Sequence, residues 1–498
     1  MYRRKNIVIT VMCLILLFMA IGYAAFSTVL NIKGTASTDS KWNIRFTNIT
    51  DGEAVGKANN NSTPSYLNNS ATMDVNLEEP GDSMTYVLTL SNDGNLGAVV
   101  EDVIVEESGS MAIIYTISGI KIGQRLASGE SIQITIKIEY NPAVTSQPID
   151  TSKTLTIAIN TVQDLGQTTT ETNPIIVSYS TLREKVLTSN TPMDDSNINF
   201  GEVSGVTNGQ GLYYTATNTE DGKITYYFRG NVENNYVSFA NHIWRIVRIN
   251  EDGSIRLVTQ DSVIQSEYNS NDSVDNNDGD NALIGYKYGT VGASSYALAH
   301  ENRNNSIVKD ALDMWYTTNL KDYFKYLADA GFCNDRSIVS GLDYALGYDW
   351  YYTYYGSYNR LENLNQPQFA CSQTNDLFTT STSNKGNKSL SNPVGLLTAD
   401  EVVYAGGSSN STNNNYYLDN NTNWWTMSPY AVNEGIEGFH ANMWYVNSDG
   451  GVYSILLNPN EFYGNSYNAR PVINLKADVK VSTGDGSSGT PYVIKIEQ

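Results

Sequence analysis

The chain of 498 residues is long enough for two or three domains with hydrophobic cores of their own. Its 31 Lys and Arg residues are outnumbered by 52 Asp and Glu residues, and the net charge of −21 would repel a phosphate backbone. We therefore expect no nucleic-acid partner. The hydrophobic content of 40% is typical of a folded protein rather than a disordered one.

The first thirty residues predict a location. Three cations at positions 3–5 precede an apolar run from residue 7 to residue 26, which has about the 20 residues that a helix needs to cross a bilayer. The positive-inside rule places these cations in the cytoplasm and the rest of the chain outside. We predict a transmembrane anchor or uncleaved signal over residues 1–30, with membrane contact through residues 7–26. The alternative is a secreted protein, because Ala25-Phe26-Ser27 is an imperfect signal-cleavage site.

Residues 31–165 have the pattern of strands. Ile132, Ile134, Ile136 and Ile138 alternate with polar residues, which is typical of a strand with one buried face. About seven such segments, without a helix between them, predict an Ig-like β-sandwich. Residues 166–178 begin with a polar stretch that ends in a proline, and they are expected to form a linker.

Residues 179–498 mix helical and strand signals. Thr181 with Glu184, and Thr398 with Glu401, have the spacing of helix capping boxes. Residues 306–330 carry apolar side chains at helical spacing, with a break at 317–319. The sequence Glu-Asp-Gly at 251–253 predicts a hairpin turn. Because there is no regular strand–helix–strand order, the expected class is α+β.

The three cysteines separate into two groups. Cys13 lies in the apolar run, and Cys333 and Cys371 remain as a pair in the exported part. In an oxidising environment such a pair predicts a disulfide, and the alternative is two free buried thiols.

No catalytic residue is predicted. The three histidines lack metal-binding spacing, and the chain has no nucleophile elbow or phosphate-binding loop. The acidic segment 269–281 is rich in oxygen ligands, so that Asp275, Asp278 and Asp280 are weak candidates for a Ca²⁺ site. The segment does not match an EF-hand, and a solvated loop is favoured. No other cofactor is expected.

Two aromatic segments are candidates for ligand binding. Residues 350–358 read Trp-Tyr-Tyr-Thr-Tyr-Tyr-Gly-Ser-Tyr, and Trp424, Trp425 and Trp444 lie further on. Aromatic rings of this kind stack on sugars or bind a protein partner, and the alternative is that they fill a core. The candidate ligand-binding residues are Trp350, Tyr352, Tyr354, Tyr355, Trp424, Trp425 and Trp444.

Three motifs in the C-terminal part carry a family resemblance. The sequence W-W-T-M-S-P begins at Trp424, V-N-S-D-G begins at Val446, and A-R-P-V-I-N-L begins at Ala469. Together these motifs resemble a family of exported proteins of Firmicutes and related bacteria that ends in a domain of unknown function. More distantly, they are similar to C-type-lectin-like folds such as formylglycine-generating-enzyme-like domains. The resemblance implies a compact α+β domain whose loops contact a ligand.

The combined prediction is an N-terminal membrane helix, an Ig-like β-sandwich and a C-type-lectin-like α+β domain. We expect a non-catalytic cell-surface protein that binds an extracellular glycan or protein. One alternative is a structural component of a surface fibre or biofilm matrix, since open strand edges can pair with other chains. The other is an extracellular hydrolase, which needs a pocket with paired carboxylates among Asp343, Asp349, Asp400 and Glu401.

Overall fold

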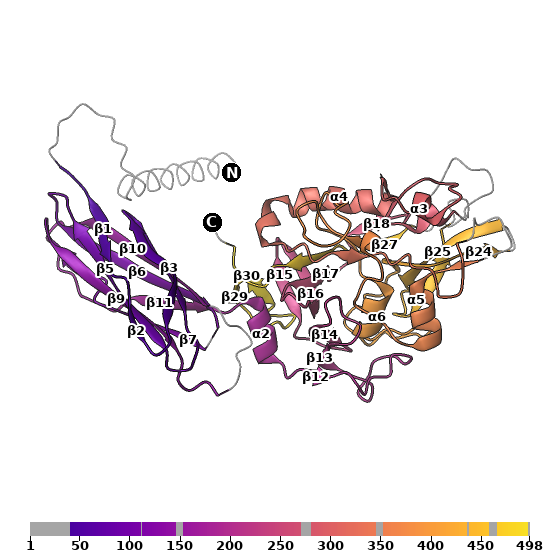
Figure 1. The fold of residues 1–498 in the computed structure, drawn as a ribbon, viewed down its shortest axis with the longest axis horizontal. Helices are drawn as coiled ribbons and strands as arrows, with labels where there is room; N and C mark the ends of the chain where they lie inside the picture. Colours follow the sequence, from indigo (N-terminus) through magenta and orange to yellow (C-terminus); the bar gives the residue numbers. More distant parts are fainter. Residues whose placement is uncertain are drawn as a thin grey trace, which may run out of the picture. The chain divides into compact units, whose positions relative to one another are not determined.

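The computed structural model describes residues 40–110, 112–145, 153–269, 280–344, 352–435, 438–457 and 466–496. The predicted membrane segment at residues 7–26 lies outside these ranges. Within them, no helix is both long enough and apolar enough to cross a membrane. The chain divides into two compact units, Met1–Ser180 and Thr181–Gln498 (Figure 1).

The described part of the first unit is built from strands. They are β1 (Ile44–Ile49), β2 (Glu53–Val55), β3 (Asn59–Leu67), β4 (Ser70–Asn76), β5 (Ser83–Asn92), β6 (Ala98–Gly109), β7 (Ile113–Ser118), β8 (Arg125–Leu126), β9 (Ser131–Tyr140), β10 (Lys153–Gln163) and β11 (Ile175–Tyr179). One sheet has the order β1-β5-β9-β7, with β2 paired to β5. A second has the order β10-β6-β11, with β8 paired to β6, and β3 and β4 form a hairpin.

The core of the first unit follows from the predicted alternation. The isoleucines of β9 are buried, whereas Gln133 between two of them is exposed. They pack with Tyr86 and its apolar neighbours in β5, and with Val103 and Val105 of β6 in the other sheet. Two sheets that bury their inner faces against each other form a sandwich-like arrangement, as the sequence predicts.

The end of the first unit differs from the predicted linker. Strand β11 begins at Ile175 and pairs in parallel with β6, so it belongs to the sandwich. Before it, Thr172 and Ile122 exchange two backbone hydrogen bonds of 2.9 Å. A polar segment can still be held in place by its backbone, which carries one donor and one acceptor per residue. Residues 166–178 are therefore largely paired to the sandwich, and the unit ends at Ser180.

The second unit combines short helices with many strands, which agrees with the predicted α+β class. Its α-helices are α2 (Leu182–Ser189), α3 (Tyr296–Ala299), α4 (Ile307–Asn319), α5 (Gly356–Tyr358) and α6 (Ala399–Ala405). Its other helical turns are η1 (Asn281–Ile284), η2 (Lys321–Tyr326), η3 (Asn359–Leu364) and η4 (Thr374–Asp376).

Two larger sheets run through this unit. The first contains β12 (Met193–Asp194), β13 (Gly211–Thr215), β14 (Thr225–Arg229), β15 (Tyr236–Phe239), β16 (His242–Ile249), β17 (Ile255–Thr259), β28 (Val472–Leu475), β29 (Val481–Thr483) and β30 (Tyr492–Ile494). The second contains β18 (Ile264–Ser266), β22 (Thr353–Tyr354), β24 (Trp424–Gly435), β25 (Gly438–Val446), β26 (Val452–Leu456) and β27 (Tyr467–Ala469). Two small ladders pair β19 (Lys287–Tyr288) with β20 (Asn304–Asn305), and β21 (Phe332–Cys333) with β23 (Leu377–Phe378). A continuous hydrophobic core joins the two larger sheets.

Local signals account for several of these elements. The Thr398 side chain accepts from the backbone of Glu401, whose carboxylate accepts from Thr398, so the predicted capping box begins α6. Strands β16 and β17 pair across the predicted turn. The helix predicted at 306–330 ends at Asn319, where the side chain of Asn319 bonds to the carbonyl of Trp315. Such a bond competes with the helical backbone, and the chain continues as η2.

Candidate functional site: a tyrosine patch

Three of the predicted ligand-binding residues belong to the core. Trp424, Trp425 and Trp444 have exposed fractions of 1%, 0% and 0%. Their prediction as surface rings that stack on a ligand is therefore wrong. The indole of Trp425 donates to the carbonyl of Ser266 at 2.8 Å, and that of Trp444 donates to Ser357 Oγ at 3.1 Å.

Tyr355 is also buried, with no exposed surface, and its hydroxyl lies 2.6 Å from Oδ1 of Asn281. Trp350 lies outside the described residues. The exposed part of the predicted aromatic segment is therefore Tyr352, which is 42% exposed, with Tyr354 and Tyr358, which are half-buried.

These rings gather with a tyrosine that sequence reasoning missed. The rings of Tyr354 and Tyr358 are 4.4 Å apart, and those of Tyr358 and Tyr430 are 5.2 Å apart. Tyr352 lies 6.1 Å from Tyr354. We call Tyr352, Tyr354, Tyr358 and Tyr430 the tyrosine patch. The only sequence signal for Tyr430 was its place directly after the W-W-T-M-S-P motif.

The backbone explains which tyrosines face outward. Strand β22 pairs with β24, with Tyr354 opposite Ala431. Because side chains alternate along a strand, Thr353 and Tyr355 point inward and are buried, while Tyr352 and Tyr354 point outward. Helix α5 then turns the chain so that Tyr358 packs against both Tyr354 and Tyr430.

A carboxylate and an amide flank the patch. The side chain of Asn410 donates to both oxygens of Glu362, at 2.9 and 3.1 Å. Burial, together with the negative charge of Glu362, raises the pKa of Tyr430 to about 12. The phenol therefore keeps its proton and can donate a hydrogen bond. Aromatic faces beside hydroxyl, amide and carboxylate groups provide both stacking area and hydrogen bonds for a ligand.

The predicted Ca²⁺ ligands do not come together in the described structure. Asp275 and Asp278 lie outside the described residues. Asp280 begins η1, with its carboxylate oxygens 2.7 Å from the backbone nitrogen of Ala282 and 2.5 Å from that of Gly292. No group of three or more potential metal ligands is found among the described residues.

Among the described residues, the carboxylates that were considered as a catalytic pair of a hydrolase do not face one another in a pocket. Two of them are engaged in ion pairs. Asp400 accepts two bonds from Arg360, at 2.8 and 2.9 Å. Burial would raise the pKa of Glu401, but Arg256 and Arg248, at 2.7 and 3.1 Å, lower it below its ordinary value. Glu401 thus remains ionised. Asp343 is exposed and Asp349 lies outside the described residues, so these groups do not form a paired site.

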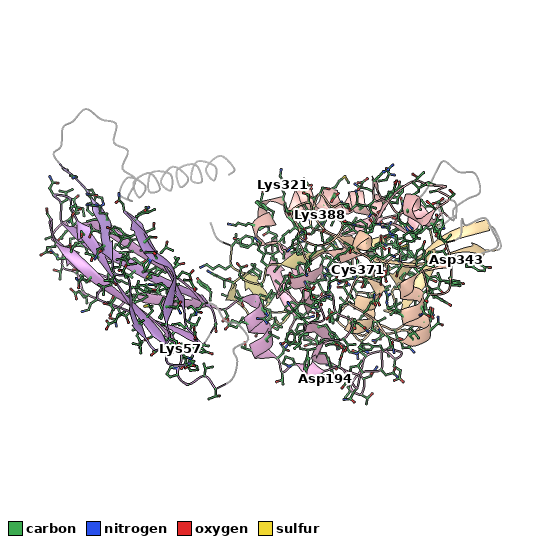
Figure 2. The ribbon with its side chains drawn as sticks, viewed as in Figure 1. Lys57, Asp194, Lys321, Asp343, Cys371 and Lys388 are labelled. Atoms are coloured by element: carbon green, nitrogen blue, oxygen red, sulfur yellow. A yellow bond between two sulfur atoms is a disulfide. The ribbon has the colours of Figure 1, made fainter. Side chains whose placement is uncertain are left out.

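The predicted disulfide is present between Cys333 and Cys371, with Cα atoms 5.5 Å apart. Figure 2 places Cys371 within the second unit, apart from Asp343. The backbone nitrogen of Cys371 also donates to Glu220, at 2.8 Å. The bridge joins β21 to the segment that precedes η4.

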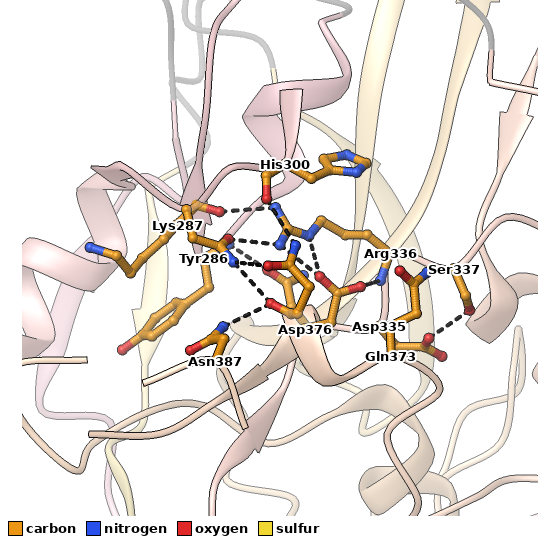
Figure 3. Close-up of polar contacts among 12 residues, drawn as sticks. Tyr286, Lys287, His300, Asp335, Arg336, Ser337, Gln373, Asp376 and Asn387 are labelled. Carbon is orange, nitrogen blue, oxygen red and sulfur yellow. Dashed lines mark hydrogen bonds and ion pairs between the residues drawn. The ribbon is translucent and has the colours of Figure 1, made fainter. Parts of the chain in front are cut away.

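Next to the disulfide lies a buried polar cluster around Arg336 and Asp376 (Figure 3). The guanidinium of Arg336 also donates to Asn302 Oδ1 at 2.8 Å and to the carbonyl of Lys287 at 3.0 Å. His300 is almost fully buried beside it. These contacts hold four separate segments together, which indicates a structural role for the cluster.

Comparison with protein-family models, with curated proteins and with solved structures found no match to this chain.

Proposed function

We propose that this chain is a cell-surface protein whose second unit binds an extracellular carbohydrate through the tyrosine patch. Residues 7–26 would anchor the protein in the membrane. If this segment were cleaved off, the protein would be secreted. The first unit would act as an Ig-like stalk, and the second as a lectin-like head. The observation that supports this proposal is the cluster of four tyrosine rings at the surface, one exposed and three half-buried, in a unit whose Trp424, Trp425 and Trp444 are all buried.

The chemistry of the patch suits sugar rings. Tyrosine presents a rigid aromatic face with a polar hydroxyl at its end, which can stack on the apolar face of a sugar and bond to its hydroxyl groups. Glu362 is an acceptor and Asn410 is a donor and acceptor beside the rings. The net charge of −21 disfavours polyanionic ligands, so the proposed ligand is a neutral glycan.

The experiment is a glycan array probed with the whole chain and two variants. Tyr354→Ala removes the central ring of the patch, and Tyr453→Ala removes a half-buried tyrosine of β26 that lies outside the patch. Loss of one stacking ring is expected to weaken binding by roughly tenfold. The matched control should bind like the unaltered chain.

Two results would contradict the proposal. One is the absence of any glycan ligand for the unaltered chain. The other is equal binding by Tyr354→Ala and the unaltered chain, provided that both have the same thermal midpoint of unfolding. Binding of a protein partner instead of a glycan would likewise overturn the carbohydrate assignment.

A further inference from the structure

An amine and a carboxamide meet on the small ladder of β19 and β20. The two strands are antiparallel, and Lys287 stands directly opposite Asn305. Directly opposite residues of such a ladder point to the same face, with their Cβ atoms about 4.5–5.5 Å apart. Nζ of Lys287 donates a hydrogen bond to Oδ1 of Asn305. The amine of one strand is therefore held against the carboxamide of the other.

A carboxylate lies on the other side of the same carboxamide. Nδ2 of Asn305 donates to Oδ1 of Asp310 at 2.7 Å. Asp310 is in the first turn of α4, which begins at the N-cap residue Ser306. This start of the helix is fixed to β19, because Oγ of Ser306 donates to the carbonyl of Tyr286 at 2.8 Å. Lys287, Asn305 and Asp310 thus form a row of three polar side chains with the carboxamide in the middle.

The backbone of Lys287 is held while its amine is directed elsewhere. Its carbonyl accepts from Nη1 of Arg336 at 3.0 Å. Figure 3 shows the side chain of Lys287 extending away from Arg336, so the amine is not part of the buried cluster around Arg336 and Asp376. An attacking group gains most when its position is fixed before the reaction, as it is for this amine.

The surroundings of Lys287 favour the uncharged amine, which is the nucleophilic form. Burial, followed by the charge of Lys309, lowers the pKa of Lys287 below its ordinary value, although Asp313 and Asp310 act in the opposite direction. Lys309 has no exposed surface and forms its own ion pair with Asp313. A lower pKa increases the fraction of Lys287 that carries a free lone pair at neutral pH.

We propose that Lys287 and Asn305 become joined by an isopeptide bond, with the carboxylate of Asp310 as the proton carrier. The lone pair of Nζ attacks Cγ of Asn305, and the electrons of the C=O double bond move to Oδ1. Asp310 takes one proton from Nζ and gives it to Nδ2. The oxyanion then re-forms the carbonyl and expels Nδ2 as ammonia. One Nζ–Cγ bond forms and one Cγ–Nδ2 bond breaks, so neither an oxidant nor a reductant is required.

The bond closes the segment between β19 and β20 into a covalent loop. This segment contains α3, and the loop ends directly before α4. Reducing agents, which open the disulfide between Cys333 and Cys371, leave an amide intact. The second unit would therefore keep one covalent cross-link under reducing conditions. This is a modification of the chain itself and lies outside the tyrosine patch.

Tryptic peptide mapping of the whole, unaltered chain after reduction and denaturation tests the bond. Trypsin cleaves after lysine and arginine, so the unlinked chain gives the separate peptides 257–287, 288–303 and 304–309. The bond blocks cleavage after Lys287 and joins residues 257–303 to residues 304–309 through the two side chains. We expect this branched peptide, with a mass lower than the sum of its two parts by one ammonia. Its absence would overturn the proposal.

Mapping also separates the isopeptide bond from a second reaction that releases ammonia. Asn305 could instead close a succinimide ring on the backbone nitrogen of Ser306. The mass loss would then lie within peptide 304–309, and cleavage after Lys287 would proceed normally. Loss of ammonia without a branched peptide would overturn the proposal.

A pair of lysine variants tests the nucleophile. Lys287→Arg keeps the positive charge and removes the reactive amine, so the branched peptide should disappear. The matched control is Lys321→Arg, which changes an exposed lysine of η2 and should give the branched peptide as the unaltered chain does. If peptide 304–309 remained cross-linked in Lys287→Arg, another amine would be the nucleophile and the proposal would be wrong.

A pair of aspartate variants tests the proton carrier. Asp310→Asn should slow formation of the branched peptide by roughly a hundredfold or more, since this is the usual contribution of general acid–base catalysis. Asp322→Asn changes an exposed aspartate in the first turn of η2 and should leave the rate unchanged. The rate is followed by mapping samples taken at intervals after synthesis, from variants with the same thermal midpoint of unfolding. Equal rates in Asp310→Asn and the unaltered chain would overturn the role of Asp310.

Discussion

Arg336 and Asp376 form an ion pair in which neither side chain is exposed to solvent. Nε and Nη2 of Arg336 lie 2.9 and 2.6 Å from Oδ1 of Asp376, and the backbone nitrogen of Arg336 lies 2.6 Å from Oδ2 (Figure 3). Each residue lies within five positions of a disulfide cysteine, Cys333 or Cys371. The ion pair and the disulfide therefore join the same two segments of the second unit.

Replacing Arg336 by methionine should strongly destabilise the second unit. The variant leaves the carboxylate of Asp376 buried without its cation, which costs about 3–5 kcal/mol of unfolding free energy. Urea unfolding followed by tryptophan fluorescence measures the change, since several buried tryptophans lie in this unit. The double variant Arg336→Met, Asp376→Leu should lose less than the single variant, because no unpaired charge remains. A double variant that loses more would contradict this account.

Removing the disulfide should lower stability through the unfolded state. The bridge closes a loop with a sequence separation of 38 residues, and the chain-entropy model gives a stabilisation of about 3–4 kcal/mol for a loop of this size. The variant with Cys333→Ala and Cys371→Ala should unfold at correspondingly lower urea concentration. Reduction of the unaltered chain should give the same shift. An unchanged midpoint on reduction would show that the bridge contributes nothing to stability.

The burial of His300 predicts a dependence of stability on pH. Burial, followed by the charge of Arg336, lowers the pKa of His300 from 6.5 to about 2. The folded-state pKa is thus below the unfolded value, so the unfolded chain alone gains a proton as the pH falls below 6.5. The contribution of the neutral His300 to the free energy of unfolding is complete above pH 6.5. It decreases as the pH falls from 6.5 toward 2. Between pH 7.5 and pH 5 the expected loss is about 2 kcal/mol.

The variant His300→Phe tests this assignment, because it keeps an aromatic ring against Tyr296 and removes the titrating group. Its free energy of unfolding should change less between pH 7.5 and pH 5 than that of the unaltered chain. Chemical denaturation at both pH values measures the difference. An identical pH dependence in the two proteins would assign the effect to other groups.

Loss of the Trp425 side chain should mainly lower stability, whereas loss of the Tyr354 side chain should mainly weaken glycan binding. Trp425→Ala creates a cavity in the core and should cost about 3–5 kcal/mol of unfolding free energy. Tyr354→Ala removes a half-buried surface ring, so it should reduce glycan binding with a much smaller loss of stability. The milder variant Trp425→Phe keeps the fold, and it should bind glycan like the unaltered chain. If a folded Trp425→Phe protein bound glycan more weakly than the unaltered chain, Trp425 would have to be assigned to the ligand site after all.

Much of the local structure was accessible from sequence because it depends on neighbours in the chain. The alternation of Ile132 to Ile138 predicts which face of β9 is buried, since a strand repeats every two residues. Thr398 and Glu401 predict the start of α6 because a capping box closes within four residues. The pairing of Cys333 with Cys371 followed from counting the cysteines that lie outside the apolar run at residues 7–26.

The same reasoning reached the candidate site only in part. Tyr352 and Tyr354 were predicted to bind ligand and lie in the patch, whereas Tyr355 beside them is buried. Because side chains alternate along a strand, the neighbours Tyr354 and Tyr355 must point to opposite sides of the chain. The sequence alone did not show which of the two sides is exposed to solvent. Tyr430 was missed because it comes from a strand more than seventy positions away and joins the patch only when β22 pairs with β24.

The sequence by itself therefore determined the strand pattern of the first unit, the α+β character of the second and the disulfide. Only the tertiary structure decided which aromatic residues can meet a ligand. Trp424 and Trp425 stand in the most distinctive motif of the chain and are covered on all sides, among neighbours that include Arg470 and Ser266. Exposure depends on which distant segments cover a residue, and this long-range packing is not encoded in the spacing of nearby residues.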